Sequence, residues 1–257
     1  MVSIFSYLKR RYLVLFFLFS SALFSQNQYL KIDYIEEFGL KELHSSRQYK
    51  TELFLKDDQA SLYRVDTETS TSEINSDKEG NGSDYSYKPS NARYLYYFND
   101  LRNSLITYKW YIAFKKFYIT DSPTFNWKLT SEFKDILGYK CQKATLEFRG
   151  RSYEAFFTNE LGVKGGPWKF HNLPGAILEV YSVDDEFKIK AYQIKTIEAE
   201  ELLISNPYSG EKTITWDEYK TLYTKKYQET KSIVYDNNVT SSMPVMNREL
   251  LVEENDR

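Results

Sequence analysis

Short stretches in which apolar and polar residues alternate recur along most of the chain, and a period of two residues is typical of β-strands with one buried face. This pattern predicts strands at 29–38, 51–55, 60–65, 92–98, 104–112, 114–120, 125–129, 139–148, 151–158, 176–183 and 187–197. Polar residues at 56–59 and 184–185 indicate hairpin turns. The clearest hairpin turns at Arg149 and Gly150, because glycine permits the positive φ angle that a tight turn needs.

One segment follows the helical period instead. Thr215 and Glu218 are spaced as a capping box. Aromatic residues recur from there at spacings of three, four and four residues, which places them on one face of a helix: Trp216, Tyr219, Tyr223 and Tyr227. We therefore expect a C-terminal amphipathic helix that packs this aromatic stripe on the sheet or on a partner.

Two segments lack the pattern of a buried element. Residues 66–90 are rich in Ser, Thr, Asn, Gly and charge, and Ile74 is their one aliphatic residue, which predicts a mobile surface loop. Residues 232–257 are expected to form a polar tail. We expect residues 26–231, including the loop at 66–90, to form a single domain. Its predicted fold class is mainly β, a single antiparallel sheet shaped as a bowl or an open barrel, with one C-terminal amphipathic helix.

The first 25 residues have the order of a secretory signal. Lys9, Arg10 and Arg11 precede an apolar run at 12–19, and small residues follow. This run is shorter than the ~20 residues that span a bilayer. We expect cleavage after residue 25 and no permanent membrane span afterwards, the alternative being an uncleaved N-terminal anchor. A lipid anchor near this site is not expected, because the chain has one cysteine, at 141.

Composition and charge narrow the classes of function. The 23 Tyr and 17 Phe favour strands, and tyrosine suits a sheet with one face in water. The chain has 34 Lys+Arg and 36 Asp+Glu, and three basic residues leave with the signal, so the remainder carries a net charge of about −5. An acidic surface argues against a nucleic-acid partner. A single cysteine excludes an internal disulfide.

The search for catalytic chemistry yields one weak candidate. The sequence has one cysteine and two histidines, and the candidate catalytic dyad is Cys141 with His171. Cys141, however, lies in a predicted strand, where a free thiol usually behaves as a small buried hydrophobe. Metal motifs, a P-loop and a dinucleotide-binding pattern are missing from the sequence, so we expect no metal and no cofactor. Carboxylate pairs for glycoside chemistry stay open as an alternative: Glu132, Glu147, Glu154 and Glu179.

The most unusual local sequence runs from 162 to 179, GVKGGPWKFHNLPGAILE. Its Gly and Pro residues predict a constrained loop. Trp168 and Phe170 either form an exposed platform beside His171 and Arg151 for a sugar or peptide, or plug one end of the β core. The loop is the candidate binding element, with the following residues: Gly166, Pro167, Trp168, Phe170, His171, Leu173, Pro174 and Gly175.

Several motifs in order carry a family resemblance. They are Trp127, ILGYKCQKA at 136–144, FRGR at 148–151, Tyr153, Phe157-Thr158, GPWKF at 166–170 and LPGAI at 173–177. Together they resemble the GLPGLI family, exported proteins of Bacteroidota, although Asn172, Ala176 and Phe156 depart from its pattern. The chain is also similar to the N-terminal, non-catalytic, bowl-like module of type II peptide N-glycosidase F.

The resemblance implies a periplasmic or secreted β module used as an accessory or recognition surface. We therefore expect an exported protein with a non-catalytic binding or structural role in the cell envelope. Its partner would be an envelope protein, a peptide or a glycan. The alternative is an accessory domain or enzyme that acts on glycans, glycoproteins or peptides.

Overall fold

The computed structural model describes residues 27–40, 45–74, 93–199, 204–231, 234–235, 239–240, 243 and 248–253. The expected signal peptide, residues 75–90 of the expected loop, and part of the expected tail lie outside these residues. The strands of the main sheet are β1 (Asn27–Leu40), β2 (Ser45–Leu55), β3 (Ala60–Ile74), β4 (Tyr94–Asp100), β5 (Leu105–Ile112), β6 (Lys115–Asp121), β7 (Lys128–Ile136), β8 (Tyr139–Phe148), β9 (Arg151–Thr158), β10 (Ala176–Ser182), β11 (Phe187–Ala199) and β12 (Thr213–Thr215). Two short strands, β13 (Val234–Tyr235) and β14 (Val239–Thr240), pair separately.

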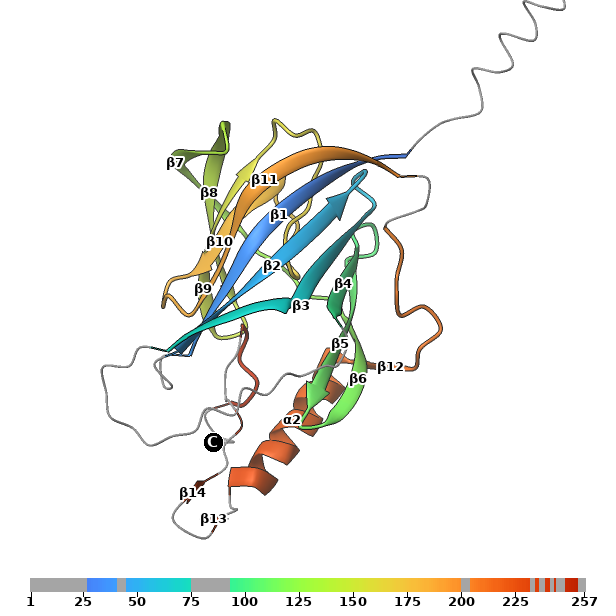
Figure 1. Ribbon diagram of the computed structural model, residues 1–257, viewed down its shortest axis with the longest axis vertical. Helices are drawn as coiled ribbons and strands as arrows, with labels where there is room; N and C mark the ends of the chain where they lie inside the picture. Colours follow the sequence, from blue (N-terminus) through green and yellow to red (C-terminus); the bar gives the residue numbers. More distant parts are fainter. Residues whose placement is uncertain are drawn as a thin grey trace, which may run out of the picture.

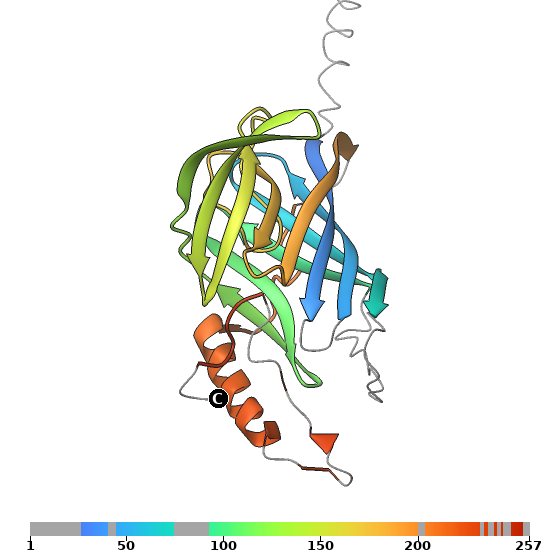
Figure 2. The same ribbon diagram turned by 90° about the vertical axis from the view of Figure 1, so that its left-hand side faces the viewer.

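The main sheet has twelve strands in the order β12-β6-β5-β4-β3-β2-β1-β11-β10-β9-β8-β7. Strands β1 to β6 form one antiparallel meander and β7 to β11 form a second. The pairing of β1 with β11 joins the two meanders. The sheet curves strongly around an interior but stays open, and only β12 pairs in parallel (Figure 1, Figure 2). The predicted fold class, mainly β with an open antiparallel sheet and one helix, is confirmed.

The predicted hairpins form because their turns suit the chain locally. Residues 56–59 connect β2 to β3, and residues 184–185 lie in the turn between β10 and β11. Arg149 and Gly150 have φ angles of 45° and 79°. Positive φ at both central residues is typical of the two-residue turns that match the twist of paired strands.

Two boundaries differ from the sequence prediction. The expected loop from residue 66 begins later, since β3 continues to Ile74 and pairs with the start of β2. Its threonines and serines take part in the ladder through their backbone, which needs no aliphatic side chain. The expected strand at 125–129 is wrong: residues 122–127 are irregular, and β7 begins at Lys128. Phe125 packs on the Phe148 and Phe170 rings instead of entering a ladder.

The concave face carries a row of buried tyrosines from β1, β3, β4 and β5. Tyr34, Tyr63, Tyr97 and Tyr108 follow one another with ring centroids 5.2 to 6.4 Å apart. Three of their hydroxyls reach polar partners inside the protein: Ile177 O, Glu36 and Lys169. Tyrosine suits these buried positions, because its apolar ring packs against its neighbours while its hydroxyl forms a hydrogen bond.

Helix α2 (Trp216–Lys231) covers the ends of β5 and β6 (Figure 1). The capping box is present: the Thr215 amide donates to the Glu218 carboxylate (2.8 Å), and the Glu218 amide donates to the Thr215 hydroxyl (3.2 Å). Trp216, Tyr219 and Tyr223 are buried, so the predicted aromatic stripe is confirmed as the packed face. Among the described residues, no helix is long and apolar enough to cross a membrane.

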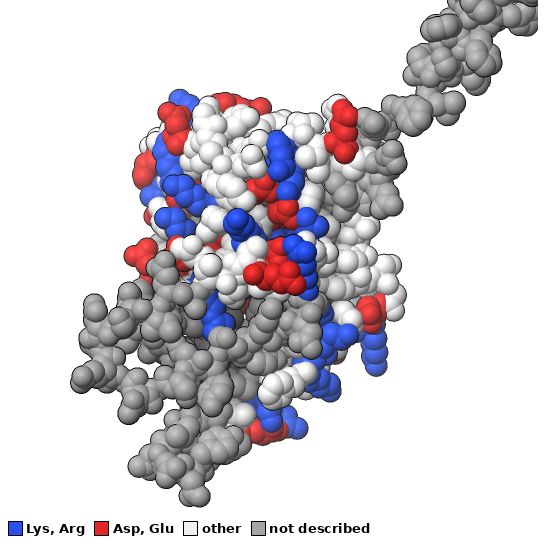
Figure 3. Space-filling model, in the orientation of Figure 1, with Lys and Arg blue, Asp and Glu red and all other residues white. Residues whose placement is uncertain are grey.

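Charges of both signs lie side by side on the outer face (Figure 3). Lys31 of β1 pairs with Asp33 (2.9 Å) and with Glu52 of β2, and Glu52 also pairs with Arg64 of β3. The cationic ends of Lys31 and Arg64 lie 5.8 and 5.1 Å from the centroid of the Phe54 ring. This face is polar and nearly balanced in charge.

Candidate functional site

Residues 159–175, which connect β9 to β10, fold into the concave face of the sheet; we call this loop the plug. Trp168 and Phe170 are 2% and 0% exposed, with ring centroids 5.0 Å apart. The plug is tied to both meanders. Asn99 of β4 donates to the Trp168 carbonyl (3.4 Å), and the Ile177 amide at the start of β10 donates to the Gly165 carbonyl (2.9 Å).

Two glycines of the plug are required by close approach of neighbouring atoms. A Cβ atom on Gly175 would lie 2.1 Å from the Thr158 carbonyl oxygen, and one on Gly166 would lie 2.6 Å from a methyl carbon of Ile177. The side chain of Leu173 is buried as well, and Pro167 is buried while Pro174 is exposed. The candidate binding loop is therefore mostly interior.

Of the two alternatives that the sequence leaves open for Trp168 and Phe170, the exposed aromatic platform is wrong. His171 and Arg151, which were placed beside it, are buried too. An open sheet leaves an apolar concave face that water would otherwise reach, and these rings fill it. The alternative drawn from the sequence, a plug of the β core, describes the structure.

The ammonium group of Lys169 lies buried next to these rings, with 1% of the side chain exposed. It donates hydrogen bonds to the Tyr108 hydroxyl (3.0 Å), the Asp121 carboxylate (3.0 Å) and the Glu249 carboxylate (2.5 Å). It also lies 4.5 Å from the centroid of the Trp216 ring, within cation–π range. Burying an ammonium group is costly unless it is paired, and the two carboxylates provide that pairing.

Arg149, in the turn between β8 and β9, holds the same two carboxylates. Its guanidinium makes two hydrogen bonds to Asp121 (2.7 and 2.8 Å) and one to Glu249 (2.7 Å). Burial alone would raise the pKa of Asp121, but Lys169 and Arg149 outweigh it and hold that pKa below its usual value. Burial also opposes the charge of Arg149, yet the two acids raise its pKa above the ordinary value. The four groups form a charged centre of two cations and two anions.

Glu249 reaches this centre from residues 248–253, which we call the strap. The Leu250 amide donates to the Arg149 carbonyl (2.8 Å), while the side chains of Leu251 and Val252 are buried. The expected polar tail is therefore wrong for these residues, because a short aliphatic run within it enters the interior. The strap runs between the open end of the sheet and α2 (Figure 1).

A cavity of about 30 Å³ lies beside the charged centre, at Lys169 and Glu249. It is lined by Tyr97, Tyr108, Trp110, Trp168, Lys169, Trp216, Tyr219, Arg248, Glu249 and Leu251. That volume is enough for about one water molecule. The interior therefore has no room for a sugar ring or a peptide side chain beside the strap.

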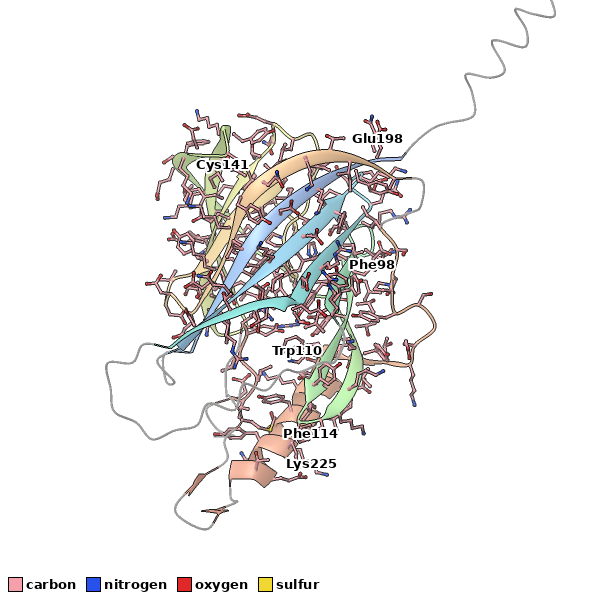
Figure 4. The ribbon with its side chains drawn as sticks, in the orientation of Figure 1. Phe98, Trp110, Phe114, Cys141, Glu198 and Lys225 are labelled. Carbon is pink, nitrogen blue, oxygen red and sulfur yellow. The ribbon has the colours of Figure 1, made fainter. Side chains whose placement is uncertain are left out.

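Cys141 and His171 do not form a dyad. Cys141 alternates along β8 with Gln142 and so lies on the face opposite to Ala144, whereas His171 packs inside the concave face against Phe125 (4.9 Å between ring centroids). Figure 4 shows Cys141 at the β7–β8 end of the sheet, away from Trp110 at the cavity. Burial raises the pKa of Cys141 to about 11, so the thiol is a poor nucleophile at neutral pH.

A cleft of about 450 Å³ opens on the outer face of the sheet. It is lined by Glu37, Lys134, Glu179, Tyr181, Asp185, Phe187 and Lys188. The Lys134 ammonium of β7 pairs with Glu179 of β10 (3.0 Å) although β8 and β9 lie between these strands. The β7 edge therefore curls over the outer face, and the cleft lies beneath that curl.

Three of the four candidate carboxylates, Glu132, Glu154 and Glu179, are engaged in ion pairs in or near this cleft. Lys143 pairs with both Glu132 (3.2 Å) and Glu154 (3.0 Å). The Tyr181 hydroxyl donates to Glu154 (2.5 Å) and, together with Lys143, lowers the pKa of that carboxyl. A general acid for glycoside hydrolysis needs a raised pKa, so Glu154 lacks the property that this role requires. Glu147 lies exposed on β8.

Sequence reasoning missed the charged centre. Lys169 stands between two aromatic residues in the most constrained loop of the chain, which was a signal for a buried cation. Its partners come from β6 and from the strap, 48 and 80 residues away. Nothing in the local pattern around Asp121 or Glu249 indicates that these residues meet.

Comparison with known proteins gives a family. The sequence profile described as "N-glycanase peptide, N-terminal domain" matches residues 48–221. Two solved structures of PNGF-II, in C2 and P21 space groups, each have a TM-score of 0.47, with 18% and 17% identity over 78% and 84% of this chain. The chain spans 33% and 38% of those structures, about a third of their length.

A further solved structure is similar over most of its own length. The LolA superfamily protein NE2245 from Nitrosomonas europaea has a TM-score of 0.30 and 8% identity over 72% of this chain and 93% of its own. A search of curated proteins gave no match. The resemblance to the N-terminal module of the peptide N-glycosidase is thus confirmed, while the resemblance to the GLPGLI family stays a prediction.

The tight fit of the plug predicts a graded response to alanine. Gly175→Ala should lower the free energy of unfolding by about 3 kcal/mol or more, because the new Cβ meets backbone atoms that cannot move aside. Gly162→Ala is the matched control: it has open space around it but a φ of +68°, so a loss of about 1 kcal/mol is expected. Equal losses in chemical denaturation would contradict this account of the plug.

The buried imidazole predicts a dependence of stability on pH. Burial lowers the pKa of His171 below 6.5, so the unfolded chain takes up a proton at a pH where the folded protein does not. The free energy of unfolding should therefore fall as the pH drops below 6.5, by up to about 1.4 kcal/mol per pH unit. His171→Asn keeps a donor for the Lys169 carbonyl, which accepts from Nδ1 (2.9 Å), and should remove this slope between pH 6.5 and the lowered pKa. Identical slopes would show that His171 titrates normally.

Proposed function

The chain belongs to the family of the N-glycanase peptide, N-terminal domain, and from this membership we propose that it is an exported, non-catalytic module that binds glycoproteins of the cell envelope. The chain spans about a third of PNGF-II, so the proposal concerns a recognition module and not the activity of that whole protein. Export is part of the proposal and rests on the signal-like order of residues 1–25.

The outer cleft is the observation that supports binding best. Glu37, Glu179 and Lys188 offer charged hydrogen-bonding groups, and the Tyr181 ring lies beside them. Sugar recognition combines these two elements, because hydroxyls bond to charged side chains while the apolar face of the ring packs on an aromatic. The volume of about 450 Å³ is within the range of ligand sites.

The register of the strands explains why these side chains converge. Glu37 of β1 is opposite Lys188 of β11, and Lys188 is opposite Tyr181 of β10. Residues directly opposite one another share a face of the sheet, so the three form one row across the outer surface. The curl of β7 brings Lys134 over the next row at Glu179.

The charges of the cleft favour binding over catalysis. Glu179 is paired with Lys134, and Glu154 beside the cleft has a lowered pKa. A pair of carboxylates for glycoside chemistry needs one member that holds a proton. Hydrolysis of a glycan is therefore the alternative function, and the binding experiment below distinguishes it.

The proposal predicts binding of an N-glycosylated peptide that depends on the cleft. Tyr181→Ala should weaken the affinity about tenfold, a loss of roughly 1.4 kcal/mol, because it removes the ring beside Glu37 and Lys188. Isothermal titration with the glycopeptide and with the deglycosylated peptide would measure this. Tyr192→Ala is the matched control, since Tyr192 is an exposed tyrosine of β11 that does not line the cleft.

Equal affinity of the two variants would place binding elsewhere, and a folded wild-type chain that binds neither peptide would contradict the proposed function. Release of free glycan by the wild-type chain would instead support the enzyme alternative.

A further inference from the structure

Without the strap, two buried charged sites in the body of the protein lack a full counter-charge among the residues that the structure describes. Lys169 and Arg149 are two cations beside the single anion Asp121, which is 3% exposed. Glu36 of β1 is a fully buried carboxylate that accepts a hydrogen bond from the Tyr63 hydroxyl (2.6 Å). The body therefore presents an excess positive charge at one place and a negative charge at another.

The strap supplies one partner for each. Glu249 receives hydrogen bonds from Arg149 and Lys169. The guanidinium of the preceding residue, Arg248, pairs with Glu36. Burial lowers the pKa of Arg248 to about 10, because the guanidinium group is removed from water. Two adjacent residues of opposite charge thus complete two buried sites.

The strap makes two further kinds of contact that are typical of a bound peptide: hydrogen bonds to its backbone and burial of its apolar side chains. Its backbone is held at two points: the Leu250 amide donates to the Arg149 carbonyl, and the Tyr153 hydroxyl donates to the Arg248 carbonyl. The Leu250 side chain lies over Gly150, where an added Cβ would come within 3.0 Å of it. Leu251 and Val252 fill the apolar space next to α2, and the Thr224 hydroxyl donates to the Leu251 carbonyl (3.4 Å).

We propose that the β8–β9 turn, the plug, Glu36 and α2 form a binding site for an extended peptide of the pattern Arg-Glu-aliphatic-aliphatic, and that residues 248–252 of this chain occupy it as an internal ligand. A segment of another protein with the same Arg-Glu-aliphatic-aliphatic pattern displaces these residues and binds in their place. The site is on the interior side of the sheet and is separate from the outer cleft.

The selectivity of this site follows from charge. An incoming peptide without the glutamate leaves Lys169 and Arg149 with one uncompensated buried charge, and a peptide without the arginine does the same to Glu36. Removing one partner of a buried pair is strongly unfavourable. The cavity of about 30 Å³ beside Glu249 and Leu251 has room for about one water molecule, so the site also selects against peptides whose apolar residues are much larger than those of the strap.

The first test uses the full chain with Glu249→Gln, which weakens the internal ligand and alters no residue of the body. The probe is a fluorescent peptide of residues 248–253, blocked at both ends. This variant should bind the probe at least tenfold more tightly than the wild-type chain, because the probe's glutamate restores neutrality. A probe with Gln at that position should lose this gain. Glu253→Gln is the control on the same strap, since Glu253 is half exposed and pairs with Lys220 at the surface, and it should bind like the wild type.

A folded Glu249→Gln chain that binds the probe no better than the wild type would overturn the proposal. Hydrogen exchange of the wild-type chain decides the matter even if that variant does not fold. Strap amides, that of Leu250 above all, should exchange at least 100-fold faster than amides of β9, because the strap leaves while the sheet stays intact. Exchange of both at the same rate would mean that the strap is released only by global unfolding, and the proposal would fail.

Discussion

The rest of the structure depends on the neutralisation of one buried ammonium group. Lys169 is carried into the interior by the plug, and its charge is balanced by Asp121 from β6 and Glu249 from the strap. Rings from β5, the plug and α2 surround it. An uncompensated charge at this depth is strongly unfavourable. The end of β6, helix α2 and the strap are therefore held in place around the Lys169 ammonium group.

This arrangement divides the molecule into an interior that holds the fold and an outer surface that carries the cleft proposed above as the binding site. The most distinctive sequence of the chain, at 162–179, serves the interior: its aromatic rings fill the concave face, and its glycines allow the backbone to pass close to β9. The outer cleft comes from unremarkable charged residues on β1, β7, β10 and β11. A distinctive loop is thus no guide by itself to where a partner binds.

Local signals in the sequence predicted most of the fold. The hairpin at Arg149-Gly150 and the helix from Trp216 were found because turn chemistry and helical spacing involve neighbouring residues. Pairings between distant residues were not found. The contact of β1 with β11, and that of Lys169 with Glu249, join residues whose own surroundings give no sign of the partner. Whether Trp168 is a platform or a plug could not be decided either, because an extended aromatic pair suits both until the curvature of the sheet is known.

The joining of β1 to β11 has a consequence for the order in which the protein assembles. Asn27 pairs with Ala199 and Phe38 with Phe187, so β1 receives one of its two neighbours only after the second meander has been made. Topologies rich in such distant pairings fold slowly. The charge that completes the interior arrives later still, with Glu249. Early stretches of the nascent chain are therefore left without their final partners, and maturation of the core is deferred until residue 249 has been synthesised.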